Sequence, residues 1–529
     1  MTIRILASAA AMLMAAVTAH AQQAAENRDT VHFPISCSEV QGRFDHALAL
    51  LHNFAYPDTV KAFQAIGEAD PDCAMAYWGL AIGEMPNPLS PPFPPGNLDA
   101  GWAAIQKGKA AKTQTPRETK YLAAVEALYR DYDKLDHHTR ALRYEQAMQR
   151  LHEQYPDDSE AAIFYALALN MAVDFSDRTY SRQLKAAAIL NDEAKKQPNH
   201  PGITHYLIHA YDFAPLAALC VSTAQHYDKL APASAHALHM PSHIYSLLGM
   251  WDDSIRSNLA AKAAIEANAG KDFNPAWEAH LLDFLVYAYL QEAKDGEAKR
   301  IVDFVPKPNQ DSFFSLTIDT ALAAIPARYP LDRGRWDEAM RLPVGDSAYP
   351  AARSITYFAR ALGAARSGNS AAARGEISHL DDIERQLTSA NDDYWAGQTR
   401  IQRQAAAAWV MFADGQHDAA IAAMRSAADQ DDAAEKTVAM ENKLVPIRAL
   451  LGEAYLAAGR NEEALAEFEI SLKVMPNRFR TMAGAAAAAR AVGSTGAAKD
   501  YSRALLQLAE SGDGDRPELS QARAYVGQR

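Results

Sequence analysis

The 529-residue chain is predicted to be all-α, an array of helix–turn–helix units that stack on one another. Three observations predict this class. His205 and His239 lie 34 residues apart, a period typical of stacked helix hairpins, and His209 and His243 repeat it. The chain closes on a repeat of helical periodicity that reads VPIRALLGEAYLAAGRNEEALAEFEISLKVMPN. No stretch shows the alternation of apolar and polar residues, rich in β-branched side chains, that indicates a strand.

Residues 1–21 are predicted to form a signal peptide. Arg4 gives a positive start, residues 5–17 are apolar, and Ala19-His20-Ala21 is a small-x-small cleavage site. The apolar run is too short to span a bilayer comfortably, and no later stretch approaches the length of a membrane helix. We therefore expect a periplasmic or secreted protein without a membrane span, whose mature chain starts near Gln22.

The net charge limits which partners the protein can bind, and the cysteines bear on the cellular compartment in which it folds. The formal net charge of −13 argues against a nucleic-acid surface, because such a surface needs clustered Lys and Arg. In an oxidising compartment Cys37 and Cys73 can form a disulfide, since each lies at the edge of a predicted helix; two free thiols are the alternative. Cys220 is expected to be a small buried residue.

An N-terminal array is expected over residues 37–305, after a polar leader at residues 22–36. It begins with a helix pair over Cys37–Ile66, broken near Tyr56-Pro57-Asp58. The next helix, within CAMAYWGLAIGEM, carries small residues where helices must approach closely: Gly79, Ala81 and Gly83.

Residues 86–97 read PNPLSPPFPPGN and are too rich in proline to be helical. We expect an ordered loop or lid there, placed to cover a site. A helix start is predicted at Thr115, because Thr115-Pro116-Arg117-Glu118 combines a capping residue, a proline and an acid in the first turn. His-rich repeats follow over residues 200–290.

A C-terminal helical array is expected over residues 306–525. Its first part is less regular, with helices predicted near Ser354–Ser367, Ala373–Thr388 and Asp393–Ala413. In the closing repeat, small, aromatic and proline residues stand at the positions that mark a tetratricopeptide repeat: Leu451-Gly452, Tyr455, Gly459, Ala464, Phe468 and Pro476.

With CAMAYWGLA, HPGITHYLIHAYD, HALHMPSHIY and PNRFRTMAGAAAAA, the chain resembles a subgroup of exported bacterial tetratricopeptide-repeat proteins, marked by the motifs HPGxxHYxIHA and HxxHMPSHI. The resemblance implies a right-handed superhelix, an α-solenoid, whose first helices line a concave groove. It also implies that the groove binds peptides. It does not imply a histidine cluster in that groove. The histidines therefore set this chain apart from the family and are the best guide to its function.

Seven of the 17 histidines lie between His200 and Tyr245. First helices of consecutive repeats are expected to start at Pro201, Ala235 and Ala279. Positions 1, 4, 8 and 11 residues after these starts form one stripe of an α-helix, which the resemblance places on the concave side. Eight candidate ligands occupy this stripe: His205, His209, Asp212, His236, His239, His243, His280 and Asp283.

A metal ion explains this density of imidazoles. Protonated imidazoles would repel one another, and neutral ones need partners for two ring nitrogens, whereas a metal binds the neutral form. The donor set suits copper, zinc or iron better than calcium or magnesium. The six histidines can hold two ions with three ligands each. Alternatively, three histidines with Asp212 or Asp283 can hold one, or the two aspartates can orient ligand imidazoles.

Two functions of different class follow. The first is a metalloprotein that holds one or two transition-metal ions and acts oxidatively or hydrolytically on a small substrate. The second is an interaction scaffold whose histidine-lined groove binds a peptide in a pH-sensitive way; a purely structural hydrogen-bond network is a further explanation. Pro241 is expected to kink its helix. His46 and His52 lie six residues apart, do not share a helical face, and are not expected to be ligands.

Overall fold

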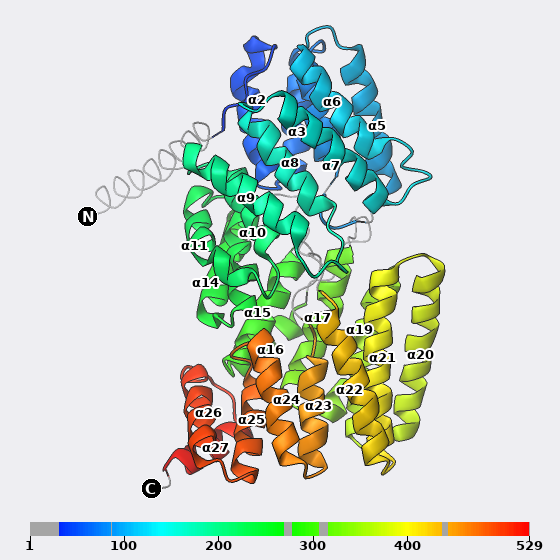
Figure 1. Ribbon diagram of the computed structural model, residues 1–529, viewed down its shortest axis with the longest axis vertical. Helices are drawn as coiled ribbons and strands as arrows, with labels where there is room; N and C mark the ends of the chain where they lie inside the picture. Colours follow the sequence, from blue (N-terminus) through cyan, green and yellow to red (C-terminus); the bar gives the residue numbers. More distant parts are fainter. Residues whose placement is uncertain are drawn as a thin grey trace, which may run out of the picture. The chain divides into compact units, whose positions relative to one another are not determined.

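The structure is a computed structural model that describes residues 31–85, 87–91, 93–268, 278–305, 316–435 and 443–527. Regular structure in these ranges is helical apart from one isolated bridge between Cys73 and Thr113, so the all-α prediction is confirmed (Figure 1). The predicted signal peptide and residues 22–30 of the leader lie outside the described residues. No described helix has the length and apolar character that crossing a membrane requires.

The chain forms two compact units. The first unit runs through Tyr211 and includes Ser222–Met240, and the second unit consists of Asp212–Val221 and Pro241–Arg529. The sequence predicts a division after residue 305 between two arrays of repeats. These arrays are not the same as the compact units, so that division stays a prediction.

Helices of the first unit pack as stacked hairpins. Each helix from α2 to α9 contacts the next, and helices two apart also touch, α2 with α4, α4 with α6 and α8 with α10. In addition α10 contacts α2, although the two are far apart in the chain. The helices are η1 Ser38–Val40, α2 Gln41–His52, α3 Tyr56–Ala69, α4 Ala74–Gly83, α5 Pro95–Ala110, α6 Pro116–Tyr129, α7 His137–Gln154, α8 Ser159–Met171, α9 Ser181–Lys196, α10 Pro201–Tyr211, α11 Val221–Leu230 and α12 Ala235–His239.

Helix boundaries follow the local signals. α6 begins at Pro116 with the predicted capping box: the Thr115 hydroxyl accepts from the Glu118 amide, and the Glu118 carboxylate accepts from the Thr115 amide. Loop residues 87–91 and 93–94 are non-helical as predicted, but α5 already starts at Pro95. A proline is tolerated in the first helical turn, where its missing N–H has no intrahelical partner to lose.

An aromatic core holds the first unit together. Phe33 lies 5.7 Å from Phe44 and 5.9 Å from Trp78, measured between ring centroids, and it is fully buried. Residues 31–36, expected to belong to a polar leader, are therefore part of the fold. Gly79 is a position of close approach, as predicted, because a Cβ there would lie 2.2 Å from the Phe63 ring.

The second unit repeats the same packing pattern from α13 to α25, with contacts between helices two apart at every step along the odd-numbered series. The helices predicted in the middle of the chain are confirmed as α19, α20 and α21. The elements are η2 Ala217–Cys220, α13 Pro241–Leu247, α14 Trp251–Asn268, α15 Ala279–Gln291, α16 Asp295–Asp303, α17 Leu316–Asp332, α18 Trp336–Met340, α19 Pro350–Arg366, α20 Ser370–Ser389, α21 Asp393–Ala413, α22 His417–Ala433, α23 Ile447–Ala457, α24 Asn461–Val474, α25 Phe479–Ala491, α26 Thr495–Leu508 and α27 Pro517–Gly527.

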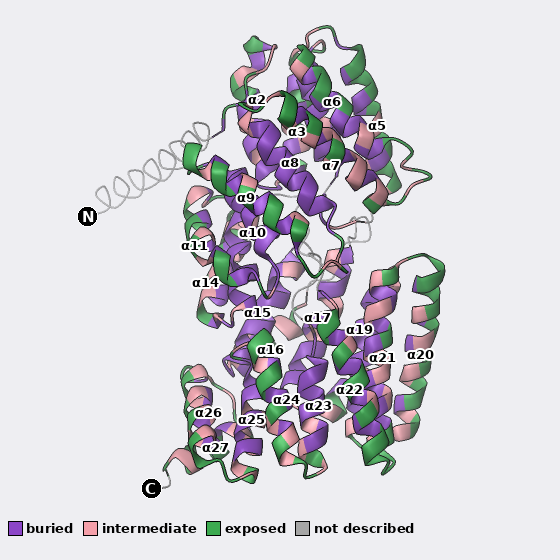
Figure 2. Cartoon of the chain, in the orientation of Figure 1, coloured by how far each residue is buried: buried purple, intermediate pink, exposed green. Residues whose placement is uncertain are grey.

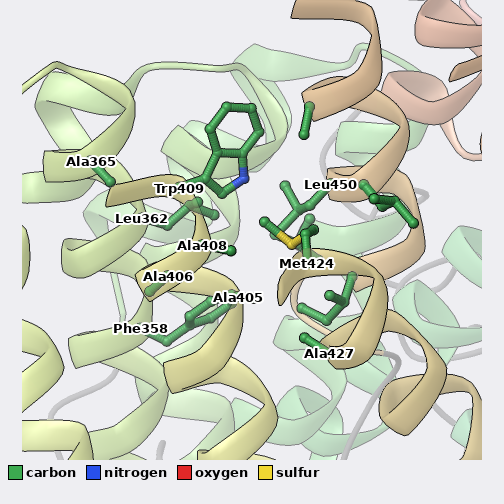
Figure 3. Packing of buried hydrophobic residues seen from close by; sticks show 14 of the residues in the cluster. Phe358, Leu362, Ala365, Ala405, Ala406, Ala408, Trp409, Met424, Ala427 and Leu450 are labelled. Carbon is green, nitrogen blue, oxygen red and sulfur yellow. The ribbon is translucent and has the colours of Figure 1, made fainter. Parts of the chain in front are cut away.

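Small and large apolar side chains alternate in the main core of the second unit. Leu362, Trp409, Met424 and Leu450 pack together across α19, α21, α22 and α23, and alanines fill the spaces between them (Figure 3). Alanine lets neighbouring helices approach closely without leaving voids, which keeps the packing dense.

A charged cluster borders this core. Glu453 accepts two hydrogen bonds from Arg480, at 2.7 and 2.9 Å, and a third from Arg366. The Arg366 guanidinium lies over the rings of Trp409 and Trp336, 4.0 and 4.3 Å from their centroids. Burial by itself raises the pKa of Glu453, but the two guanidinium groups outweigh it and lower the pKa to about 2.

The two candidate cysteines form a disulfide, Cys37–Cys73, which decides between the two alternatives in favour of pairing. Cys220 is free and buried. We expect one thiol to react with Ellman's reagent in denatured, non-reduced protein, and three after reduction, because the disulfide uses two of the three cysteines. Cys220→Ser should leave no reactive thiol without reductant; three reactive thiols in the denatured, non-reduced wild-type chain would contradict the pairing.

Glu453 should make stability depend on pH at the acid end. Its folded pKa of about 2 lies below the ordinary 4.5. Its contribution to the free energy of unfolding is therefore fully present above about pH 4.5 and is lost as the pH falls through 2. The stability gap between wild type and Glu453→Gln should therefore shrink by about 3 kcal/mol over this range. Denaturant unfolding followed by tryptophan fluorescence measures the gap, and a gap that stays constant with pH would refute the assignment.

Candidate metal centre

Helix α10 places the first two candidate ligands inside the protein. It starts at Pro201 as predicted, and all residues from Pro201 to Tyr211 are buried. It packs against α2, α8 and α9 of the same unit, and α8 is likewise almost wholly buried (Figure 2). His205 and His209, one turn apart on α10, therefore meet other side chains rather than solvent.

Three histidines bring their ligand nitrogens together in the first unit. Nε2 of His205 lies 3.0 Å from Nε2 of His209 and 3.0 Å from Nε2 of His236, which comes from α12. All three lie within 4.8 Å of one another. Two nitrogens bound to one tetrahedral zinc ion stand about 3.3 Å apart, so this spacing is compatible with a shared metal ion. We call these residues the first histidine triad.

The tautomer of His205 is set by the main chain. Its Nδ1 lies 2.6 Å from the carbonyl oxygen of His52, and because a carbonyl only accepts, Nδ1 carries the proton. Nε2 then presents its lone pair to the other two histidines. A single lone pair cannot accept well-aligned N–H bonds from both His209 and His236, whereas a cation can lie between all three.

Aromatic rings fix the orientation of the triad. Phe54 stacks on His209 and His236, with centroids 5.7 and 5.5 Å apart, and Tyr227 stacks on His205 at 5.6 Å. Phe54 has a φ of 54°, a left-handed conformation that is unfavourable for a side chain of its size. The Tyr227 hydroxyl donates to Asn53 at 2.8 Å, so the turn after α2 supports both rings.

The three histidines of the triad differ in exposure. His205 and His209 are buried, while His236 is partly exposed. An ion held by the three nitrogens would thus be shielded by protein on the α10 side and approached past His236.

A second cluster in the first unit joins His52, which was not expected to be a ligand, to Glu160 and His200. His52 Nε2 lies 3.0 Å from one oxygen of Glu160, and His200 Nε2 lies 2.8 Å from the other. Burial lowers the pKa of His52 despite the neighbouring carboxylate. Burial also opposes ionisation of Glu160, but the two imidazoles outweigh it and hold its pKa below the ordinary value. In the sequence, the sign of this cluster is Glu160, an acid in the first turn of the otherwise apolar helix α8. The three residues lie too far apart in the chain for a repeat spacing to relate them.

In the second unit, His243 lies with two other candidates. Its Nδ1 is 2.9 Å from an oxygen of Asp212, and its ring centroid is 5.6 Å from that of His280. Asp212 thus orients an imidazole, one of the two roles considered for it. His239, at the end of α12 in the first unit, is buried, with its ring centroid 6.3 Å from that of His236.

One expectation needs correction. Asp283, considered as a ligand or as an acceptor for an imidazole, is bound by Arg328, whose Nε and Nη2 donate to its two oxygens at 2.7 and 3.0 Å. A buried carboxylate needs a paired cation, and a guanidinium supplies it in a bidentate way. At Pro241, where a kink is expected, the helical hydrogen bonding is interrupted: α12 ends at His239 and α13 begins at Pro241, while Met240 keeps right-handed helical angles.

No family model and no curated protein matches this chain. Among solved structures, a chain of the Cut9-Hcn1 hetero-tetramer of APC/C is 11% identical, with 93% of this chain and 98% of that chain covered and a TM-score of 0.30. A chain of the structure of Naa15/Naa10 bound to HypK-THB is 14% identical, with coverages of 92% and 80% and a TM-score of 0.25. At these identities and scores, neither structure informs the histidines.

The packing of α10 on His52 can be tested with a glycine. A Cβ at Gly202 would lie 2.4 Å from Nδ1 of the His52 ring, so Gly202→Ala should destabilise the protein by roughly 1–3 kcal/mol through overpacking. Gly375→Ala, in the middle of α20 with nothing within 4 Å, should instead stabilise it by about 1 kcal/mol. Denaturant unfolding of both variants measures the signs, and stabilisation by Gly202→Ala would contradict the close approach.

Proposed function

We propose that the protein binds a transition-metal ion, copper, zinc or iron, through the Nε2 atoms of the first histidine triad. The observation that carries the proposal is the convergence of three ligand nitrogens within 4.8 Å, from residues on α10 and α12. The proton of His205 is held on the far nitrogen by the His52 carbonyl, as a ligand imidazole requires.

Three protein ligands leave a coordination position open, which is typical of catalytic rather than structural sites. We infer that this position faces the partly exposed side at His236 and takes a small molecule or a peptide group. The ion would supply Lewis-acid chemistry if it is zinc, or electron transfer if it is copper or iron. The protein's own residues would orient the ligands: Phe54 and Tyr227 through their rings, and His52 through its carbonyl.

A second ion is proposed for the second unit, with His243 and His280 as ligands. The contact of His243 Nδ1 with Asp212 supports it, because a carboxylate that holds the Nδ1 proton makes Nε2 the nitrogen that would bind an ion. For His239 the ligand role stays a prediction from the repeat spacing of the sequence. Asp283 is left out because Arg328 holds both of its oxygens.

We also propose that the protein works in the periplasm or outside the cell. The predicted signal peptide at residues 1–21 and the Cys37–Cys73 disulfide support this, since disulfides persist in oxidising compartments.

Metal content of variants tests the function. The chain, purified without a His tag and loaded with Cu²⁺ or Zn²⁺, should hold one equivalent more than His209→Ala, whose affinity at the triad should fall by more than about 100-fold. His226→Ala, an exposed histidine of α11 in the same unit, is the matched control and should bind like wild type. Elemental analysis and calorimetric titration measure both quantities.

A chain that takes up no copper, zinc or iron, or a His209→Ala variant that binds as much as wild type, would disprove the proposal. Metal-free protein that binds a peptide more weakly below about pH 6 would favour the scaffold function instead.

A further inference from the structure

We propose that His52, Glu160 and His200 form a metal site of their own, separate from the first histidine triad. The site goes beyond the proposed function and does not depend on it. Its ligands come from three elements of the first unit: the last residue of α2, the first turn of α8 and the residue that precedes α10.

The distances fit a shared ion. Nε2 of His52 lies 3.0 Å from one oxygen of Glu160, and Nε2 of His200 lies 2.8 Å from the other. Ligand atoms about 2.1 Å from an ion and at right angles to each other stand about 3.0 Å apart. One ligand atom from each of the three residues lies within 4.8 Å of the others.

The charge of the cluster calls for a cation. His52 has no exposed surface, and His200 and Glu160 are 1% and 4% exposed. Among the ion pairs of the described residues, Glu160 has these two imidazoles as partners and neither lysine nor arginine. Several other buried carboxylates have an arginine or a lysine beside them, as Asp283 has Arg328 and Glu193 has Lys196. A buried carboxylate without a full positive charge beside it is costly, and a divalent ion would remove that cost.

The hydrogen bonds around His52 suit a ligand imidazole. Nδ1 of His200 is buried, has no hydrogen-bond partner in the described part of the chain, and bears an N–H without an acceptor whether a proton or a metal ion is bound at Nε2. Nδ1 of His52 lies 3.0 Å from the Tyr206 hydroxyl, which can accept its proton and leave Nε2 free to bind an ion. The competing occupant is a proton on His52, with no metal.

The donor set defines the class of ion. Two imidazoles with one carboxylate are the ligands of His₂Glu zinc sites and of two-His-one-carboxylate iron sites, and they are harder than three imidazoles. The structure therefore assigns Zn²⁺ or Fe²⁺ to this cluster. Because no ligand is exposed, the ion should exchange slowly and tie α2, α8 and α10 together, whereas the triad is reached past His236.

Cobalt binding tests the site, with Co²⁺ as a stand-in for zinc. The full chain, stripped with a chelator and reloaded, should lose one equivalent of Co²⁺ in Glu160→Gln while it keeps the equivalent that His209→Ala removes. Glu193→Gln, a buried glutamate of α9 that pairs with Lys196, is the matched control and should bind like wild type. In wild type the Glu160-dependent ion should leave for a chelator at least ten times more slowly than the His209-dependent ion.

Equal cobalt content in Glu160→Gln and wild type overturns the inference and assigns the cluster to a hydrogen-bond network around a proton. Loss of the His209-dependent ion alone would leave this site standing, so the two proposals fail separately. If Glu160→Gln does not fold, anomalous scattering from crystals of the Co²⁺-loaded wild-type chain decides: a peak between His52, Glu160 and His200 supports the site, and its absence overturns it.

Discussion

One hydrogen bond, from Nδ1 of His205 to the carbonyl of His52, connects the last turn of α2 to the buried helix α10. It sets the tautomer of the central histidine of the triad and so decides that the lone pair on Nε2 faces His209 and His236. It also joins the two histidine clusters of the first unit, because His52 offers its carbonyl to one and its ring to the other. Gly202 permits this contact, since any side chain there would meet the His52 ring.

Burial of polar groups is the constraint that arranges the rest. A buried carboxylate or imidazole must find a partner, and each partner type has a different consequence. Arginine takes both oxygens of Asp283 and pairs with Glu453, which makes these groups structural. Glu160 meets imidazoles, whose nitrogens can exchange a proton for a metal ion. The same physical demand thus yields inert ion pairs in the second unit and a candidate metal site in the first.

The two clusters of the first unit differ in ways that bear on their chemistry. The triad has three imidazoles, aromatic walls and one partly exposed ligand, a combination that suits an ion with an open position. The cluster at Glu160 has a carboxylate and no exposed ligand, a combination that suits an ion held permanently. With an ion at each site, the ion at the triad would exchange and meet small molecules, while the ion at Glu160 would hold the helices in place.

The amino-acid sequence by itself determined the helical class, the starts of α10, α12 and α15, the capping box at Thr115 and the gathering of histidines, because these depend on periodicity and on residues close in the chain. Which side chains meet was decided by tertiary structure. Arg328 lies 45 residues beyond Asp283, and Glu160 lies 108 residues beyond His52, so no local spacing could relate them. Whether a polar side chain becomes a ligand, an orienting acceptor or an ion-pair partner depends on what the packed helices place beside it once water is excluded.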